Sequence, residues 1–122
     1  PHNYPENSVA YTGTHDNETI AGWWKSITAK ERKLARDYLC DNWTPDKDLH
    51  KCFISLVMRS SAKLCVIPMQ DYMGLDNSSR MNQPSTVGKN WKWRIRKREL
   101  TVKLQKEIHG IALRYGRMNW SD

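Results

Sequence analysis

The sequence predicts an α/β protein with parallel strands, and three features of the chain support this prediction. Two short apolar segments, residues 8–12 and 63–68, have the composition of β-strands. Helical patterns separate these segments and follow the second one, an alternation typical of parallel sheets. Two strands do not complete a sheet, so we expect partner strands outside this chain or self-association through exposed strand edges. We therefore interpret the 122 residues as part of a larger fold.

The first strand and the segment that follows it are short. Residues 8–12 (SVAYT) contain β-branched and aromatic side chains and lie between turn-forming residues. A helix is expected over residues 18–27 (ETIAGWWKSI). Asp16 or Asn17 can cap this helix, because both side chains accept hydrogen bonds from the free N–H groups of a first turn.

Two further helices are predicted before the second strand. One starts after Thr28, whose spacing to Glu31 is that of a capping box, and its apolar face consists of Leu34, Tyr38 and Leu39. The next is expected over residues 44–61, with Thr44 as its cap and Pro45 at the first helical position. Its apolar residues recur every three or four positions, as in an amphipathic helix: Leu49, Cys52, Phe53, Leu56 and Val57.

The second strand leads into a long polar loop and a final helix. Residues 63–68 (KLCVIP) are nearly all apolar, which is expected of a strand covered on both faces. Residues 69–91 are rich in Asn, Ser, Gly and Pro, and a loop of this length in a compact domain is often functional. The last helix is expected over residues 96–115, with Gly116 as a left-handed cap. Its apolar face consists of Leu100, Leu104, Ile108, Ile111 and Tyr115.

Composition indicates a globular, soluble and basic chain. The hydrophobic fraction is 39%, the charged fraction is 27% and the formal net charge is +7. No apolar run approaches the ~20 residues that a membrane helix needs, and no secretory signal is visible, although the chain begins with Pro1 rather than Met. Three cysteines without C-x-x-C spacing (Cys40, Cys52, Cys65) favour a reduced, cytoplasmic protein. We expect no metal site, because three of the histidines lie far apart in sequence (His2, His50, His109).

The residues His15, Asp16 and Asn17 follow the first strand directly. In parallel α/β folds, ligands bind where the strands end and the loops begin. A carboxylate only accepts hydrogen bonds, whereas an imidazole both donates and accepts, and this mixture suits neutral, hydroxyl-rich ligands such as sugars. The alternative is that Asp16 or Asn17 only caps the next helix and His15 has no special role.

Two segments resemble a known enzyme family. YTGTHDNETIAGWW (residues 11–24) resembles the seventh-strand motif of the 4-alpha-glucanotransferases, also called amylomaltases or disproportionating enzymes, which belong to the wider α-amylase clan. IPMQDYMGLDNSSRMNQPSTVGKNWKWR (residues 67–94) is similar to the eighth strand and following loop of that family. The resemblance implies that residues 1–122 are the C-terminal part of a catalytic (β/α)8 barrel, with its last two strands and closing helices. Ser85 is a departure, because the family usually carries glycine there.

The resemblance implies retaining transfer of α-1,4-glucan segments, as in starch and maltose metabolism. Asp16 matches a third aspartate that stabilises the transition state, while His15, Asn17 and Asn82 are the expected substrate-binding residues. The nucleophile and the general acid/base precede Pro1, so the isolated chain is expected to be inactive. The expected partners are α-1,4-glucans and maltooligosaccharides, and no cofactor, nucleic acid or membrane is expected.

Other residues allow alternative interpretations. Residues 91–94 (WKWR) alternate aromatic and basic side chains, so a stand-alone basic module that binds nucleic acid is the alternative function. The same alternation describes an extended segment with one buried face. Trp23 and Trp24 are expected in the core rather than on a sugar. Arg80 is expected to pair with a carboxylate inside the fold. Asp71 is expected to be either a substrate contact or a turn residue.

Overall fold

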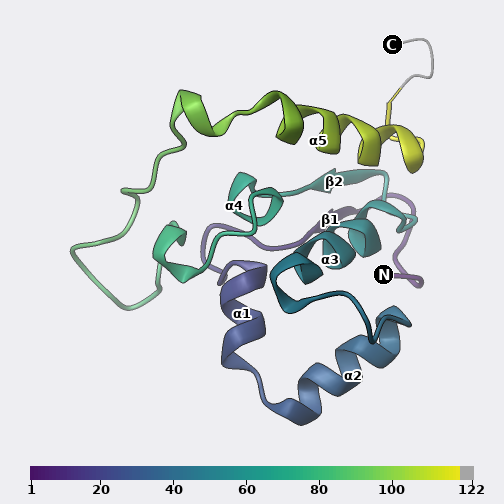
Figure 1. The fold of residues 1–122 in the computed structure, drawn as a ribbon, viewed down its shortest axis with the longest axis horizontal. Helices are drawn as coiled ribbons and strands as arrows, with labels where there is room; N and C mark the ends of the chain where they lie inside the picture. The colour runs from purple at the N-terminus through teal and green to yellow at the C-terminus, as the bar shows by residue number, and fades with distance from the viewer. Residues whose placement is uncertain (119–122) are drawn as a thin grey trace.

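The computed structural model describes residues 1–118 and contains two parallel strands (Figure 1). Strand β1 (Val9–Tyr11) pairs with β2 (Leu64–Val66), and Ala10 lies opposite Cys65. Both predicted strands and their parallel pairing are therefore confirmed, although each strand has only three residues. In the described part of the chain the sheet ends with these two strands, so each has one edge without a partner strand.

The described residues also contain five α-helices. Helices α1, α2 and α3 lie between β1 and β2, and α4 and α5 follow β2 (Figure 1). Their bounds are Ile20–Ser26 for α1, Ala29–Leu39 for α2, Leu49–Met58 for α3, Met69–Tyr72 for α4 and Val102–Arg114 for α5. Three short 3₁₀ turns lie at Asp46–Asp48, Asn77–Ser79 and Lys97–Glu99.

The helix ends confirm two predicted caps. Thr28 and Glu31 form the capping box at the start of α2, with the Thr28 N–H donating to Glu31 Oε2 at 2.8 Å and the Glu31 N–H donating to Thr28 Oγ1 at 3.3 Å. Gly116 has a φ of +64°, so it ends α5 in the left-handed conformation. Both devices are short-range, which explains why sequence spacing predicted them.

Two other predicted caps are wrong. The cap of α1 is Thr19, whose Oγ1 accepts from the Gly22 N–H at 3.1 Å, so neither Asp16 nor Asn17 caps this helix. The helix expected to start at Thr44 begins instead at Leu49, after the 3₁₀ turn. Thr44 does not cap α3, because its hydroxyl and N–H donate to the carboxylate of Asp41.

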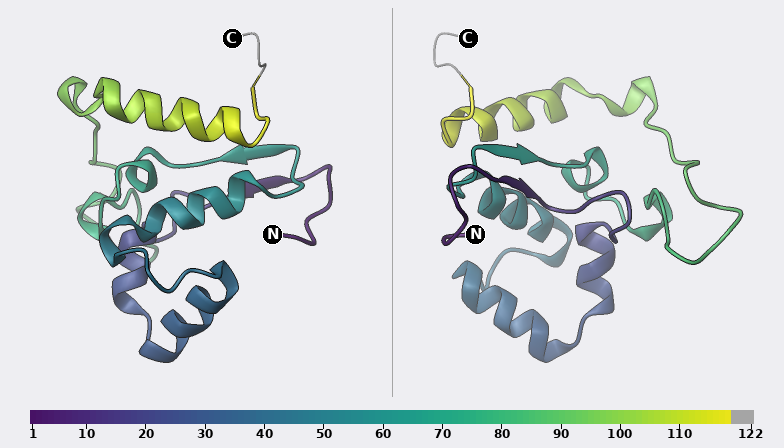
Figure 2. Two further views of the ribbon diagram at one scale, coloured as in Figure 1. Left: turned by 45° about the vertical axis from the view of Figure 1, so that its right-hand side comes forward. Right: turned by 180° about the vertical axis from the view of Figure 1, so that it is seen from behind.

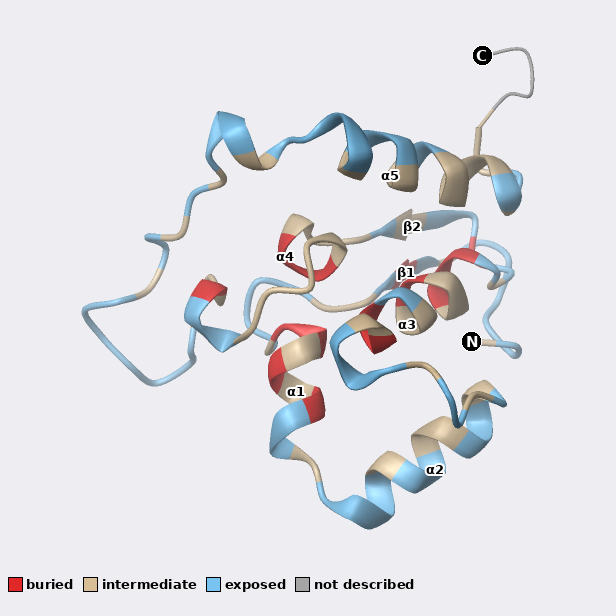
Figure 3. Cartoon of the chain, in the orientation of Figure 1, coloured by how far each residue is buried: buried red, intermediate tan, exposed pale blue. Residues whose placement is uncertain are grey.

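The core lies on one face of the sheet. Ala10 and Cys65 point to the same side, where α3 packs on the strands and α5 packs on α3. The central side chains of this core include Ile20, Ile54, Val57 and Met58. Figure 3 shows the buried segments concentrated on α1, α3 and α4. The amphipathic pattern of α3 is confirmed, because Leu49 and Val57 are buried.

The opposite face of the sheet is open. Along each strand successive side chains alternate between faces, so the neighbours of Ala10 and Cys65 point away from the core. These four apolar side chains are between 41% and 55% exposed: Val9, Tyr11, Leu64 and Val66. Seen from behind, the strands lie in front of α3 (Figure 2). In the described part of the chain, residues 64–66 are therefore covered on one face only.

Helix α2 is also open on its predicted apolar face. Leu34 is 60% exposed and Tyr38 is 47% exposed, and no residue of α2 is buried. Two arginines connect α2 to the core, because Arg32 and Arg36 lie over the ring of Trp24 at 5.8 and 5.4 Å from its centroid. The helix is therefore attached to the rest of the chain through charged rather than apolar side chains.

Asp41 organises the connection between α2 and α3, and its removal should make stability less sensitive to acid. The hydroxyl and N–H of Thr44 lower the pKa of Asp41 to about 2, from an ordinary value of 3.8. Because the folded-state pKa is the lower one, the carboxylate stabilises the fold above about pH 4, and this contribution disappears as the pH falls towards about 2.

The measurement compares thermal midpoints of the protein that contains this chain, with Asp41 and with Asp41→Asn, between about pH 6 and about pH 2. We expect the variant to be less stable near neutrality and the difference to vanish at the acid end. A difference that stays constant across this range would contradict the assignment.

Candidate functional site

The candidate site lies where the two strands end. Because β1 and β2 are parallel, the loops that follow them emerge at the same edge of the sheet. His15 and Asp16 lie in the loop after β1, and Asn82 lies in the segment that follows β2 and α4. The Asn82 N–H donates to the His15 carbonyl at 3.1 Å, so backbone bonding joins the two loops directly.

Three of the four predicted site residues meet there. Asp16 Oδ1 accepts a hydrogen bond from Asn82 Nδ2 at 2.6 Å, and Asp16 Oδ2 lies 3.4 Å from His15 Nε2. The side chains of His15 and Asp16 are 57% and 47% exposed. The carboxylate is thus held by neighbours on both oxygens and remains open to solvent. Such a group can accept further hydrogen bonds from a hydroxyl-bearing ligand.

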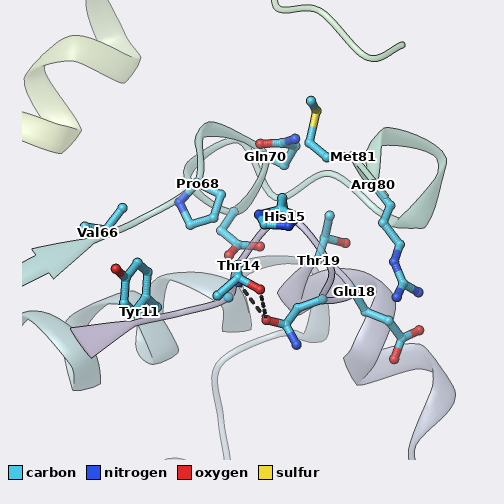
Figure 4. Close-up of a pocket in the computed structure, with 13 residues that line it drawn as sticks. Tyr11, Thr14, His15, Glu18, Thr19, Val66, Pro68, Gln70, Arg80 and Met81 are labelled. Atoms are coloured by element: carbon cyan, nitrogen blue, oxygen red, sulfur yellow. Dashed lines mark hydrogen bonds between the residues drawn. The ribbon is translucent and has the colours of Figure 1, made fainter. Parts of the chain in front are cut away.

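Asn17 has a different position. Its Oδ1 accepts from the Thr14 N–H at 2.7 Å and from Thr14 Oγ1 at 2.9 Å, as the dashed lines in Figure 4 show. The Asn17 N–H in turn donates to the Thr14 carbonyl at 3.2 Å. Asn17 therefore stabilises the turn that carries His15 and Asp16, and its side-chain oxygen already accepts two hydrogen bonds from Thr14.

Two hollows flank this loop. One, shown in Figure 4, has a volume of about 460 Å³ and is lined among others by Tyr11, His15 and Met81. The other has a volume of about 710 Å³ and is lined among others by Asp16 and Trp23. Both volumes are within the ~300–1,000 Å³ that is typical of small-molecule sites. The loop therefore exposes its polar side chains between two spaces large enough for a ligand.

Arg80 connects the two loops of the site, and the prediction that it pairs with a carboxylate is wrong. Its Nη2 donates to the Asp16 carbonyl at 2.6 Å, and its Nε donates to the Asn82 carbonyl at 2.9 Å. The guanidinium therefore binds two backbone oxygens, one in each loop, and not a carboxylate inside the fold. Through these bonds it fixes the separation between Asp16 and Asn82.

Asp71 is a second brace that lies deeper. It is only 2% exposed, its Oδ1 accepts from the Ile20 N–H at 2.8 Å, and its Oδ2 accepts from the Thr12 hydroxyl at 2.6 Å. Thr12 and Ile20 stand at the two ends of the loop that carries His15 and Asp16. Of the two roles considered from the sequence, the structure favours a structural one, because both oxygens of Asp71 are occupied by the protein.

Sequence reasoning missed the contribution of Asn77. Its Oδ1 accepts from the Thr19 N–H at 3.2 Å, and its Nδ2 donates to Glu18 Oε1 at 2.6 Å. Gly22 makes this approach possible, because a Cβ on Gly22 would lie 2.1 Å from Asn77 Oδ1. These partners are almost 60 positions apart in sequence, so only a conserved Asn–Gly pair across many related sequences could have indicated them.

The loop that follows Asn82 is closed by polar contacts. The Gln83 N–H donates to Asn90 Oδ1 at 3.0 Å, and Asn90 Nδ2 donates to the Thr86 carbonyl at 2.9 Å. Ser85, which stands where the resemblance leads us to expect glycine, has a φ of +63°. This left-handed conformation favours glycine, so serine introduces backbone strain at this turn.

The tryptophans fall into different environments. Trp24 is 4% exposed, which confirms the prediction that it belongs to the core. Trp23 is only half-buried: it packs edge-on against Phe53 at 5.4 Å between ring centroids and lines the larger hollow, so the core prediction is met only in part for Trp23. In the aromatic and basic segment, Arg94 Nη1 donates to the carbonyls of Trp91 and Trp93 at 2.9 and 2.8 Å. The guanidinium of Arg94 thus bonds to backbone carbonyls of the same segment.

Comparison with known proteins gives consistent results. A 4-alpha-glucanotransferase family model matches residues 1–101. The chloroplastic/amyloplastic 4-alpha-glucanotransferase of Solanum tuberosum is 39% identical over 121 residues, which cover 97% of this chain and 21% of that protein. The 4-alpha-glucanotransferase of Clostridium butyricum is 40% identical over 118 residues, which cover 96% of this chain and 24% of that protein.

A solved structure matches the fold as well. The amylomaltase from Streptococcus agalactiae in complex with acarbose superposes with a TM-score of 0.90 and 37% identity, over 98% of this chain and 24% of that chain. The chain thus spans between 21% and 24% of the length of these three proteins.

In the part of the chain that the structure describes, no helix has the length and apolar character needed to cross a membrane.

Proposed function

Because this chain belongs to the 4-alpha-glucanotransferase family, we propose that the protein containing it transfers α-1,4-glucan segments between maltooligosaccharides with retention of configuration. The observation that supports this proposal most strongly is the arrangement of Asp16. Its carboxylate lies at the edge of the sheet where the strands end, bonded to Asn82, close to His15 and still half open to solvent. This is a site for a ligand rich in hydroxyl groups.

The proposed reaction proceeds through a covalent intermediate. A retaining enzyme uses a carboxylate nucleophile about 5 Å from a general acid. The nucleophile forms a bond to the anomeric carbon while the glycosidic C–O bond breaks, and the departing oxygen takes the proton of the general acid to become a hydroxyl. In a transferase the hydroxyl of an acceptor glucan then attacks the intermediate, loses its proton to the same acid/base residue and releases the nucleophile. We propose that both of these carboxylates lie outside residues 1–122, so that the isolated chain has no transfer activity.

Asp16 then serves as a third carboxylate that contacts the reacting sugar. Hydrogen bonds from the sugar hydroxyls to Asp16 strengthen as the ring approaches its oxocarbenium-like transition state. His15 and Asn82 stand on either side of this carboxylate and bind the same ring. Asn17 can contact substrate only through its amide nitrogen, because Thr14 occupies its oxygen.

The open face of the sheet supports the proposed architecture. In a (β/α)8 barrel each strand presents alternate side chains to the helices outside and to the packed interior. Ala10 and Cys65 face α3, and the four exposed apolar side chains of β1 and β2 would form part of the barrel interior. We propose that residues 1–122 supply the last two strands and closing helices of such a barrel, an incomplete domain of which residues 119–122 lie outside the described part. Further strands would then cover both free edges, and in their absence the chain would self-associate.

The proposal is tested with the full-length protein and maltotriose. Disproportionation converts two maltotriose molecules into one glucose and one maltopentaose, so glucose should appear without an equal amount of maltose. Chromatography of the products measures both. Equal amounts of glucose and maltose would indicate hydrolysis, and unchanged maltotriose would indicate no action on this substrate; either result would contradict the proposal.

The nucleic-acid alternative has less support. The aromatic and basic segment 91–94 lies within the residues that the family model matches, and the Arg94 guanidinium donates to the backbone carbonyls of Trp91 and Trp93. That the chain binds no nucleic acid, needs no cofactor and is cytoplasmic remains a set of predictions from the sequence.

A further inference from the structure

Trp91 has a backbone conformation that is unusual for its size. In the described residues, only three residues other than glycine have a positive φ: Cys40, Ser85 and Trp91. Trp91 has a φ of +64°, in the left-handed region that large side chains seldom adopt. Strain of this kind persists only where the surrounding structure enforces it, and it is concentrated at binding sites.

Burial does not explain this strain. The side chain of Trp91 is 51% exposed, so the ring gains little from packing in the core of the described chain. A backbone bond holds Trp91 against the preceding segment, because the Trp91 N–H donates to the Met81 carbonyl at 2.6 Å. This bond closes the base of the loop that begins beside Asn82 and brings Trp91 back to the candidate site.

The ring of Trp91 lies beside the polar site residues. Its centroid is 5.1 Å from the centroid of the His15 ring, and the two planes are inclined at 39°. His15 Nε2 is in turn 3.4 Å from Asp16 Oδ2. A large, half-exposed aromatic side chain therefore adjoins the carboxylate and imidazole that we assign to the reacting sugar.

We propose that Trp91 is a sugar-stacking residue, which binds the glucose unit next to the unit held by Asp16 and His15. A glucose ring is polar at its edge, but its C–H groups form two less polar faces. These C–H groups are attracted to the electron-rich face of an indole, and the contact also removes apolar surface from water. The proposal depends on the proposed glucanotransferase function, because it assigns a second glucose unit of the same substrate.

The test uses three variants of the full-length protein. Trp91→Gly removes the ring and places glycine where the left-handed conformation favours it, so the backbone should not be destabilised. Trp91→Phe retains a smaller aromatic face. Trp43→Ala is the matched control, because Trp43 is 78% exposed and lies in the connection between α2 and α3, away from both loops of the site.

Calorimetric titration with acarbose measures binding, and a maltooligosaccharide transfer assay measures kcat and KM. We expect the Kd for acarbose and the KM to rise by about threefold to tenfold in Trp91→Gly. The increase should be smaller in Trp91→Phe and absent in Trp43→Ala, and the thermal midpoint of Trp91→Gly should not fall.

The outcomes separate the two proposals. If the unmodified protein transfers glucan and binds acarbose while Trp91→Gly behaves identically, the stacking role is wrong and the glucanotransferase function stands. If Trp91→Gly lowers kcat without changing Kd or KM, Trp91 positions His15 and does not bind sugar, which also overturns the proposal. If the unmodified protein shows no transfer, the proposed function itself fails.

Discussion

Asp16→Asn in the full-length protein is expected to lower the rate of glucan transfer by about a hundredfold to a thousandfold. The amide has nearly the same shape and can still accept from Asn82 Nδ2 through its oxygen, so the loop should keep its structure. What it loses is the negative charge that strengthens hydrogen bonds to the sugar hydroxyls as positive charge develops on the ring. Because this charge develops only in the transition state, the loss should appear mainly in kcat.

The measurement is the release of glucose from maltotriose by equal concentrations of both proteins. Asp37→Asn provides the control, because Asp37 is an exposed carboxylate on α2 that pairs with Lys33 on the same helix at 2.6 Å. The control should retain full activity, and the thermal midpoints of all three proteins should agree closely. Unchanged transfer in Asp16→Asn would end the assignment of Asp16 to the transition state.

Asp71→Ala is expected to reduce the free energy of unfolding by about 2–5 kcal/mol. The substitution removes the acceptors of the Ile20 N–H and the Thr12 hydroxyl, in a place where Asp71 is only 2% exposed. Each buried donor left without a partner costs about 1–3 kcal/mol, and a cavity adds to this cost. The same change frees both ends of the loop that carries Asp16, so transfer activity should fall as well.

Urea denaturation of the full-length protein measures the loss, with Asp37→Ala as an exposed control that should change stability little. Asp71→Asn separates shape from charge. The asparagine side chain fills the same space, and its oxygen can still accept one of the two hydrogen bonds. Its NH₂ group, however, would face the second donor, either the Ile20 N–H or the Thr12 hydroxyl. We therefore expect the free energy of unfolding to fall nearly as much as in Asp71→Ala. Stability equal to that of the unmodified protein in Asp71→Ala would show that the two bonds contribute nothing.

Residues close together in sequence determined several features without help from the tertiary structure. The capping box of Thr28 and Glu31 and the left-handed end at Gly116 each depend on atoms within one turn of a helix. The parallel arrangement followed from the alternation of strands and helices. The position of His15 and Asp16 also followed from sequence, because a residue that directly follows a parallel strand must lie at the ligand-binding edge of the sheet.

Predictions failed where a side chain had the choice of a distant partner. Asp16 was a suitable cap for the next helix, yet its carboxylate accepts from Asn82, which lies 66 positions away in sequence. Arg80 was assigned a carboxylate partner, but the guanidinium donates to two carbonyls that lie close together only after the loops have met. A local sequence pattern shows which hydrogen-bonding groups a segment has. It does not show which distant groups the fold brings within bonding distance.

The sequence by itself thus determined the order of the elements, the two short-range caps and the family, because all three are encoded by neighbouring residues. Only the tertiary structure decided that Asp71 supports the loop from within, that Asn82 reaches Asp16, and that Trp91 lies against His15. These contacts join residues more than 50 positions apart. Their geometry is set by the packing of β2, α3 and α4 against β1, and that packing depends on the whole chain at once.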